Sequence, residues 1–326
     1  MSDRPPTPVT ILTGFLGAGK TTVLNHLLRL DHGLRLGVLV NDFGAVNVDA
    51  ALVARADADT IGLTNGCICC SLRGKLLDAA LELRRRAAPP DHLVVECSGV
   101  SDPSSVALPI LSPRARPELR LDAVVAVLDA ERVRAARELV AVVDAQVAAA
   151  DVVVLNKVDL VTAAEREALR AWIRVAVPRA RILETTEGRV PAEIAFGSSA
   201  TVRPPAAGRG RELPVHGMTS GTGERDRHGS NAGLATWHWT CELPLDPALL
   251  GRALRELPPE VFRAKGLALV RGADRPLVVQ LVGQRLRLSF DVDVPPARRT
   301  DLVFVGRPGA LGAPEIDARM AAAIAR

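Results

Sequence analysis

Aromatic residues are scarce in this chain of 326 residues, which has three tryptophans, six phenylalanines and no tyrosine. Proteins that bind single-stranded nucleic acid stack the bases on aromatic side chains. The basic residues behind the net charge of +4 are spread along the chain, as on a solvated surface. We therefore expect no nucleic-acid partner.

Long apolar stretches are also lacking. Acidic residues such as Asp144 and Asp151 interrupt the longest apolar runs, so none reaches the roughly 20 residues that a membrane span needs. The opening residues, MSDRPPTP, carry no apolar region of the kind found in secretion signals. These absences predict a cytoplasmic protein with no membrane partner.

Cysteine is used sparingly, because the chain has only five. So few in a long cytoplasmic chain argue against a disulfide framework. Cys97 and Cys241 stand alone in apolar, strand-like runs and are expected to be small core residues. The other three crowd into four positions, which indicates metal or redox chemistry; they are Cys67, Cys69 and Cys70.

Short apolar runs alternate with helical patterns through the first 195 residues. Runs typical of buried strands occupy residues 9–13, 36–40, 93–96, 123–129 and 152–156, and helical patterns occupy residues 21–30, 72–86 and 163–177. This alternation predicts an α/β fold with a mostly parallel sheet covered by helices on both faces. His26 and His92 are expected at the surface.

The composition changes near residue 201. Residues 201–233 are rich in Gly, Pro, Arg and Ser without hydrophobic periodicity, which predicts a flexible linker. Beyond it we expect strands at residues 236–242, 261–270, 277–281, 285–290 and 302–305, a helix at 247–257, and a last helix with Ile316, Met320 and Ile324 on one face. The predicted organisation is an α/β domain over residues 1–200, the linker, and a small α+β domain over residues 234–326.

The sequence GFLGAGKT at residues 14–21 matches the Walker A pattern and lies between a predicted strand and a predicted helix, as that pattern requires. Its glycines let backbone N–H groups surround phosphates at a helix N-terminus. Lys20 should reach the β- and γ-phosphates, and the Thr21 hydroxyl should ligate Mg²⁺. Residues 1–200 are therefore predicted to be a P-loop nucleotide-hydrolase domain, with further nucleotide contacts from Gly14, Gly17, Ala18, Gly19 and Thr22.

Asn156, Lys157 and Asp159 follow the apolar run that ends at residue 155 and indicate the base that is bound. An aspartate in this place accepts hydrogen bonds from the ring N–H and the exocyclic amine of guanine. Adenine lacks that pair of donors and would leave the carboxylate unpaired in a desolvated site. These residues favour GTP over ATP, with GDP as the product.

Two further segments follow predicted strands. Glu96-Cys-Ser-Gly99 offers an acid that holds Mg²⁺ through water and a glycine N–H that senses the γ-phosphate. Glu96 is therefore grouped with Lys20 and Thr21 as catalytic. Asn-Asp42-Phe-Gly lies where a switch segment is expected, and Asp42 is a further candidate metal ligand.

The three clustered cysteines directly precede the predicted helix 71–86, whose N-terminus would favour their thiolate form. Three thiolates suit Zn²⁺, Cu⁺ or another thiophilic or divalent metal, with a fourth position left open for transfer. Buried core cysteines and a redox sensor are the alternatives to a metal site.

The motifs GFLGAGKTT, NDFG, GCICC, ECSG and NKVD occur in this order, and together they resemble the CobW-like GTPases, relatives of the urease and hydrogenase nickel-insertion GTPases. The sequence Arg-Ala-Lys-Gly at residues 263–266 and residues 303–306 resemble that family's C-terminal domain. The resemblance implies a GTP-dependent metallochaperone, most often for zinc, that passes the metal from Cys67, Cys69 and Cys70 to a client metalloprotein.

Two features depart from the family. Asp42 stands where the family usually has a glutamate, which is one methylene longer, and the linker holds only His216 and His228 where many members carry a histidine-rich stretch. Two other functions therefore stay open. One is a GTP-driven activator that remodels a metalloenzyme or biosynthetic partner without carrying metal; the other is a signalling GTPase with a cysteine redox switch. The client and the oligomeric state are not indicated by the sequence.

Overall fold

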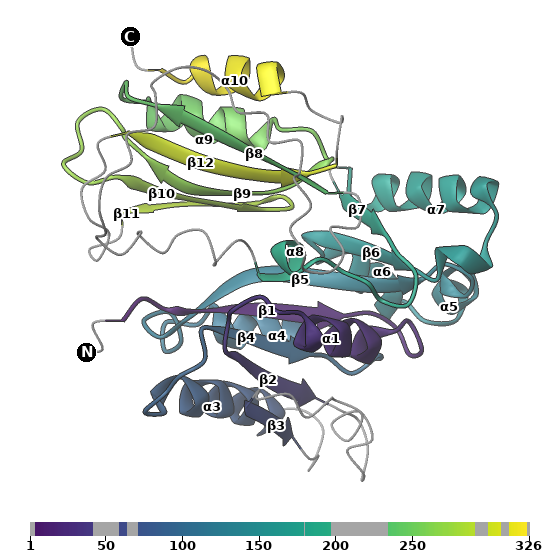
Figure 1. The fold of residues 1–326 in the computed structure, drawn as a ribbon. Helices are drawn as coiled ribbons and strands as arrows, with labels where there is room; N and C mark the ends of the chain where they lie inside the picture. Colours follow the sequence, from purple (N-terminus) through teal and green to yellow (C-terminus); the bar gives the residue numbers. More distant parts are fainter. Residues whose placement is uncertain are drawn as a thin grey trace. The chain divides into compact units, whose positions relative to one another are not determined.

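A computed structural model describes residues 4–41, 59–63, 71–178, 180–196, 234–290, 299–307 and 313–324. The chain divides into two compact units, Met1–Phe196 and Gly197–Arg326. Each unit has its own sheet and its own hydrophobic core (Figure 1). The α/β prediction with a small α+β second domain is confirmed.

The first unit is built on a parallel sheet of seven strands in the order β3-β2-β4-β1-β5-β6-β7. β4 and β6 are buried along their whole length, which explains why they read as continuous apolar runs. All seven end at one edge of the sheet. Their bounds are β1 Thr7–Thr13, β2 Leu36–Asn41, β3 Asp59–Leu63, β4 His92–Glu96, β5 Leu119–Asp129, β6 Val152–Asn156 and β7 Arg181–Glu184.

Helices cover this sheet on both faces. On one face, α3 and α4 pack together with β1, β2 and β4, and α5, α6 and α7 form a second cluster with β5 and β6, because Val124 of the first cluster and Ala126 and Leu128 of the second point to the same side of β5. Side chains alternate along a strand, so Thr10, which contacts α8, points away from the α3–α4 cluster that holds its neighbours Val9 and Ile11. The bounds are α1 Lys20–Arg29, α3 Ser71–Arg85, α4 Ser104–Ile110, α5 Val133–Leu139, α6 Val142–Ala148, η1 Val158–Leu160, α7 Ala163–Ala176 and α8 Ala192–Phe196.

Several elements of this unit were not predicted. β3 and β7 are short and carry polar or charged residues, so neither forms the apolar run that the prediction required. β5 begins at Leu119, before the predicted residue 123, because its first residues pair with the start of β1. The short helices α4, α5, α6 and α8 have five to seven residues each, too few for a clear helical period.

The second unit is an antiparallel sheet of five strands in the order β11-β10-β9-β12-β8. Ile316 and Met320 are buried in its core as predicted, whereas Ile324 lies beyond the end of the last helix and bridges to Leu245. The bounds are β8 Ala235–Cys241, α9 Pro247–Arg255, β9 Val261–Ala268, β10 Leu277–Val282, β11 Arg285–Phe290, β12 Thr300–Gly306 and α10 Ala313–Ala321.

His92 corrects the expectation of a surface histidine, because it is only 1% exposed. Thr10 Oγ1 donates its single proton to the carbonyl of Ala195 at 2.7 Å. The Nε2 of His92, 2.8 Å from the same oxygen, must therefore be the donor in its contact with Thr10. One hydroxyl thus joins β1, the start of β4 and helix α8.

Within the described parts of the chain, no helix is both long and apolar enough to cross a membrane. The predicted linker, residues 201–233, lies outside the described residues.

Replacing Thr10 tests the role of this hydroxyl. Thr10→Val leaves the buried carbonyl of Ala195 without its donor, so the free energy of local opening should fall by about 2 kcal/mol. Native-state hydrogen exchange of the β1 amides measures this change. Thr240→Val, at an exposed position of β8, should change it by less than about 0.5 kcal/mol; equal effects of the two variants would contradict the assignment.

Candidate functional site

The Walker A segment forms the turn between β1 and α1. Gly14 and Gly19 have φ angles of 137° and 99°, which L-residues with a side chain rarely adopt. Space is also lacking, because a Cβ on Gly14 would lie 2.1 Å from the carbonyl oxygen of Val127, and one on Gly19 would lie 2.5 Å from Nδ2 of Asn156. These positions therefore require glycine, and the turn packs directly against neighbouring strands.

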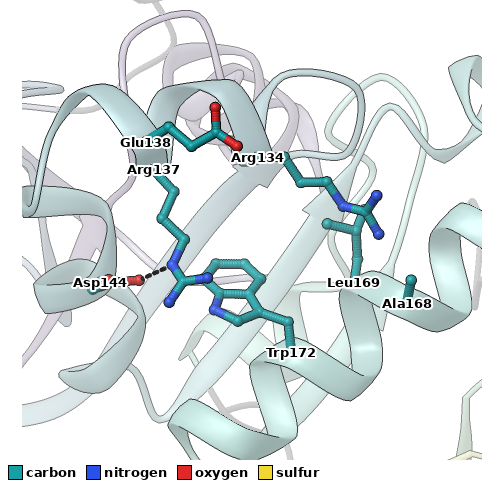
Figure 2. A pocket seen from close by; sticks show the side chains of 7 residues that line it. All are labelled: Arg134, Arg137, Glu138, Asp144, Ala168, Leu169 and Trp172. Carbon is teal, nitrogen blue, oxygen red and sulfur yellow. Dashed lines mark hydrogen bonds and ion pairs between the residues drawn. The ribbon is translucent and has the colours of Figure 1, made fainter.

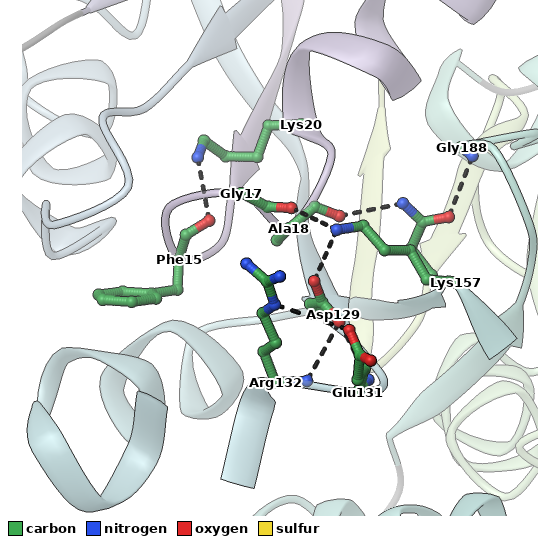
Figure 3. Close-up of polar contacts among 10 residues, drawn as sticks. Phe15, Gly17, Ala18, Lys20, Asp129, Glu131, Arg132, Lys157 and Gly188 are labelled. Carbon is green, nitrogen blue, oxygen red and sulfur yellow. Dashed lines mark hydrogen bonds and ion pairs between the residues drawn. The ribbon is translucent and has the colours of Figure 1, made fainter. Parts of the chain in front are cut away.

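Lys20, the first residue of α1, is only 7% exposed. Its Nζ donates to the carbonyl of Phe15 at 3.3 Å, so the ammonium group lies back over the turn (Figure 3). Thr22 is exposed, and the first turn of α1 contains no acidic residue. The N-terminus of α1 keeps its positive potential as an anion site.

Thr21 and Glu96 meet across the site. Glu96 is the last residue of β4, which pairs with β1, and the Thr21 hydroxyl donates to Glu96 Oε1 at 2.7 Å. Glu96 is 2% exposed. A hydroxyl and a carboxylate at the helix N-terminus form an oxygen donor set that fits Mg²⁺. The segment after Glu96 continues along β1, since the Cys97 amide donates to the carbonyl of Leu12 at 2.8 Å.

Asn156 ends β6 and is 2% exposed. Its Nδ2 donates to the carbonyl of Ala18 at 3.0 Å, and its Oδ1 accepts from the Gly188 amide at 3.0 Å. The side-chain amide therefore links the Walker A turn to the loop that follows β7. The sequence analysis assigned Asn156 to the site but missed the loop that contains Gly188. The sequence feature that could have indicated this loop is a glycine shortly after β7, which ends at the same edge of the sheet.

Lys157 adopts a left-handed conformation with a φ angle of 60°. Its Nζ donates to the carbonyl of Gly17 at 2.9 Å and to Oδ2 of Asp129 at 2.6 Å (Figure 3). Asp129, at the end of β5, is 6% exposed, and its Oδ1 accepts from two backbone amides, of Glu131 and Arg132. Asp129 is a site residue that sequence reasoning missed, because no local motif marks it.

Asp159, the predicted base reader, lies in η1 and is exposed. It follows Asn156 and Lys157 at the same edge of the sheet as the Walker A turn. Gly99 is buried after β4 and lies against Leu16 of the Walker A turn. The structure thus brings the residues predicted for phosphate, Mg²⁺ and base together at one sheet edge.

Asp42 and the three clustered cysteines, Cys67, Cys69 and Cys70, lie outside the described residues. The described residues next to them are Asn41, the end of β2, and the pair Leu63 and Ser71, the end of β3 and the start of α3. Among the residues that the structure does describe, no group of three or more His, Cys, Asp or Glu side chains is arranged to hold a metal.

A surface pocket of about 430 Å³ between α5, α6 and α7 contains none of the predicted site residues (Figure 2). The Arg137 guanidinium lies 5.0 Å from the centre of the Trp172 ring and pairs with Asp144 at 2.7 Å. These contacts join the three helices and pair the charges of Arg137 and Asp144 with each other.

A Walker A turn at the carboxyl edge of a parallel sheet, with the loop after β6 bonded to it, defines a P-loop nucleotide-binding domain. The nucleotide-binding-domain model of the CobW/HypB/UreG family matches residues 8–184, and the model of the cobalamin synthesis protein cobW C-terminal domain matches residues 234–324. The chain belongs to this CobW family and is a GTPase.

Similar proteins cover much of the chain. It is 31% identical over 315 residues to the zinc chaperone CobW of a Sinorhizobium species, covering 87% of each chain. It is 31% identical over 338 residues to the zinc chaperone CobW of Pseudomonas aeruginosa, covering 92% of this chain and 87% of the other. It is 32% identical over 222 residues to the zinc-regulated GTPase metalloprotein activator 1 of Dictyostelium discoideum, covering 56% of this chain and 46% of that one.

Asp129→Asn tests the contact between Asp129 and Lys157. The variant loses the charge-assisted hydrogen bond that holds Lys157 over Gly17, so GDP affinity should fall about tenfold, equivalent to about 1.4 kcal/mol. Equilibrium titration with a fluorescent GDP measures it. Asp144→Asn, which breaks the half-exposed pair with Arg137, should leave GDP affinity unchanged; a similar loss in both variants would contradict the assignment.

Cys97 is expected to be chemically inert. It is 1% exposed, and burial raises the pKa of its thiol to about 12, so the thiolate that reacts with alkylating agents is nearly absent at pH 8. Iodoacetamide at pH 8 should leave Cys97 unmodified in the folded protein and modify it in urea, as measured by peptide mass spectrometry. Rapid labelling of folded protein at Cys97 would show that the β4 segment opens readily.

Proposed function

We propose that this GTPase is a metallochaperone that binds zinc at Cys67, Cys69 and Cys70 and transfers it to a client protein in a GTP-dependent step. The observation that carries the proposal is the nucleotide site at the edge of the sheet where β3, the strand preceding the cysteines, also ends. The names of its relatives, zinc chaperone and zinc-regulated GTPase metalloprotein activator, support zinc as the metal.

In this proposal the Walker A turn and the start of α1 bind the phosphates. Lys20 supplies a positive charge to the β- and γ-phosphates, and the Gly99 amide contacts the γ-phosphate. The base is read by Asp159, while Asn156 and Lys157 hold the base loop against the turn, as their bonds to Ala18 and Gly17 support. Further phosphate contacts come from Gly14, Gly17, Ala18, Gly19, Thr21 and Thr22.

Thr21 and Glu96 would hold the magnesium ion that accompanies GTP. Mg²⁺, when bound, offsets the negative charge that develops on the phosphate oxygens. The Thr21 hydroxyl now donates to Glu96 and would turn its lone pair to the cation, while Glu96 reaches it directly or through water. Burial of Glu96 beside the turn keeps its carboxylate in place.

The proposed zinc segment joins β3 to α3. Neighbouring parallel strands are about 4.8 Å apart, so the ends of β3 and β1, three strands apart, are separated by roughly 14 Å. Asp42 directly follows β2, which lies between β3 and β4. Loss of the γ-phosphate would thus act within a few strands of the end of β3, from which the chain continues to the cysteines, and a coupling of about 1–3 kcal/mol would change zinc affinity about 5- to 150-fold.

A GTP-driven activator of a metalloenzyme that carries no metal itself is the second candidate. The name of the Dictyostelium relative, a GTPase metalloprotein activator, favours it. Its partner is likewise a client protein. The two functions differ in whether purified protein holds zinc on its cysteines.

We propose a domain organisation with a nucleotide-binding domain over residues 1–200, a flexible linker over 201–233 and a C-terminal domain over 234–326. The family matches, which end at residue 184 and resume at residue 234, support this division.

Zinc affinity in each nucleotide state tests the proposed function. Chelator competition under reducing conditions should give different zinc dissociation constants with Mg²⁺ and a GTP analogue and with Mg²⁺ and GDP, by at least about fivefold. Replacing Cys67, Cys69 and Cys70 by serine should abolish binding in both states. Zinc binding that is weak or independent of nucleotide would favour the activator.

Lys20→Ala serves as the matched control, because it should abolish nucleotide binding without touching the cysteines. Its zinc affinity should no longer respond to added GTP analogue or GDP. Tight GTP binding by this variant would overturn the assignment of the phosphate site.

A further inference from the structure

Gln146, on α6, is a buried polar residue with no part in the predicted site and an exposed fraction of 0%. Its Nε2 lies 3.1 Å from the carbonyl oxygen of Gly99 and 3.2 Å from that of Ser101. A carbonyl oxygen only accepts hydrogen bonds, so the group between the two carbonyls must be the NH₂, with one N–H for each. Both donors of the side chain are thus given to the segment that follows β4.

The acceptor oxygen of the same amide contributes little to the stability of the fold. Gln146 Oε1 is buried and has no hydrogen-bond partner among the residues that the structure describes. A buried polar atom without a partner is unfavourable. The two bonds from Nε2 are therefore the contacts that account for a glutamine in this apolar helix face, where Val143 and Val147 are its buried neighbours.

The other side of the segment lies against the Walker A turn. A Cβ on Gly99 would lie 2.6 Å from the backbone nitrogen of Leu16, so the two backbones are in direct contact. The Cys97 amide is bonded to Leu12, and the Ser101 amide donates to the carbonyl of Ser98 at 3.0 Å. Residues 97–101 are thus held between the phosphate-binding turn and the side chain of Gln146.

We propose that Gln146 is a positioning residue for GTP hydrolysis, which fixes residues 97–101 so that the Gly99 amide is ready to contact the γ-phosphate. The inference rests on the proposed role of Gly99. Only a triphosphate makes that contact. Fixing the segment in advance therefore reduces the entropic cost of ordering it when GTP binds, and leaves the cost of binding GDP unchanged. Gln146 therefore sets the selectivity between the two nucleotides and the turnover rate, with no contact to either.

Gln146→Met tests the proposal, because methionine has a similar volume and no N–H donor. Dissociation constants are measured for GDP and a non-hydrolysable GTP analogue with Mg²⁺, together with kcat and KM for GTP. We expect GDP affinity within twofold of wild type, analogue affinity about tenfold weaker, and kcat about tenfold lower. Equal weakening for both nucleotides, or no change in either, would overturn the proposal.

Val147→Ala is the matched control, because it removes buried apolar atoms from the same helix, in a core cluster that contains none of residues 97–101. It should lower the thermal midpoint of unfolding. The nucleotide ratio, which is the dissociation constant for GDP divided by that for the GTP analogue, should stay at the wild-type value, and a changed ratio would overturn the proposal. If Gln146→Met fails to fold, Gln146→Asn replaces it. The shorter amide cannot reach both carbonyls, so it should reduce the same ratio, and an unchanged ratio would contradict the proposal.

These measurements need no zinc, so they separate the inference from the proposed function. A reduced nucleotide ratio in Gln146→Met supports the inference about Gln146 even where zinc affinity does not depend on nucleotide. That combination would contradict the metallochaperone function alone. Nucleotide-dependent zinc binding together with an unchanged nucleotide ratio in Gln146→Met would contradict the inference about Gln146 alone.

Discussion

The side-chain amide of Asn156 joins the loops from which the nucleotide site is built. It donates to Ala18 in the phosphate-binding turn and accepts from Gly188 after β7, in a place that is almost fully buried. Breaking either bond would leave a buried backbone group unpaired, at a cost of about 1–3 kcal/mol. Lys157 adds a second link to the same turn through Gly17. The Walker A turn and the loops after β6 and β7 are therefore held at a fixed spacing.

Different contacts hold the residues at the proposed γ-phosphate side of the site. There the links are one hydroxyl bond from Thr21 to Glu96 and the two amide bonds from Gln146. The bond from Thr21 to the Glu96 carboxylate and the bond from Lys157 to Asp129 are both charge-assisted, of a kind about twice as strong as a neutral one, whereas the two bonds from Gln146 are neutral. In the proposed scheme the neutral bonds from Gln146 hold residues 97–101 beside the position of the γ-phosphate, so a change of nucleotide would act on this segment first.

The sequence predicted those parts of the site that local patterns encode. The glycine spacing of residues 14–19 and the apolar runs of β1, β4 and β6 follow from backbone geometry and burial, which act over a few residues. Asp129, Gly188 and Gln146 were missed because their partners lie 28, 32 and 45 or more residues away in the chain. His92 was misjudged for a similar reason, since the buried hydroxyl that receives its proton belongs to a strand 82 residues earlier.

The position of the proposed zinc segment in the sheet bears on release of the metal. Among the described strands, β3 pairs with β2 alone, whereas β1 and β4 each pair on both sides. An element held by one neighbour opens at lower cost than one held by two. In the proposed scheme the phosphate contacts therefore lie on the rigid centre of the sheet and the thiolates next to its more yielding edge. β2 is the one strand between β4 and β3. In the proposed scheme a displacement at residues 97–101 would therefore pass through β2, which Asp42 follows in the chain, before it reaches the cysteine segment.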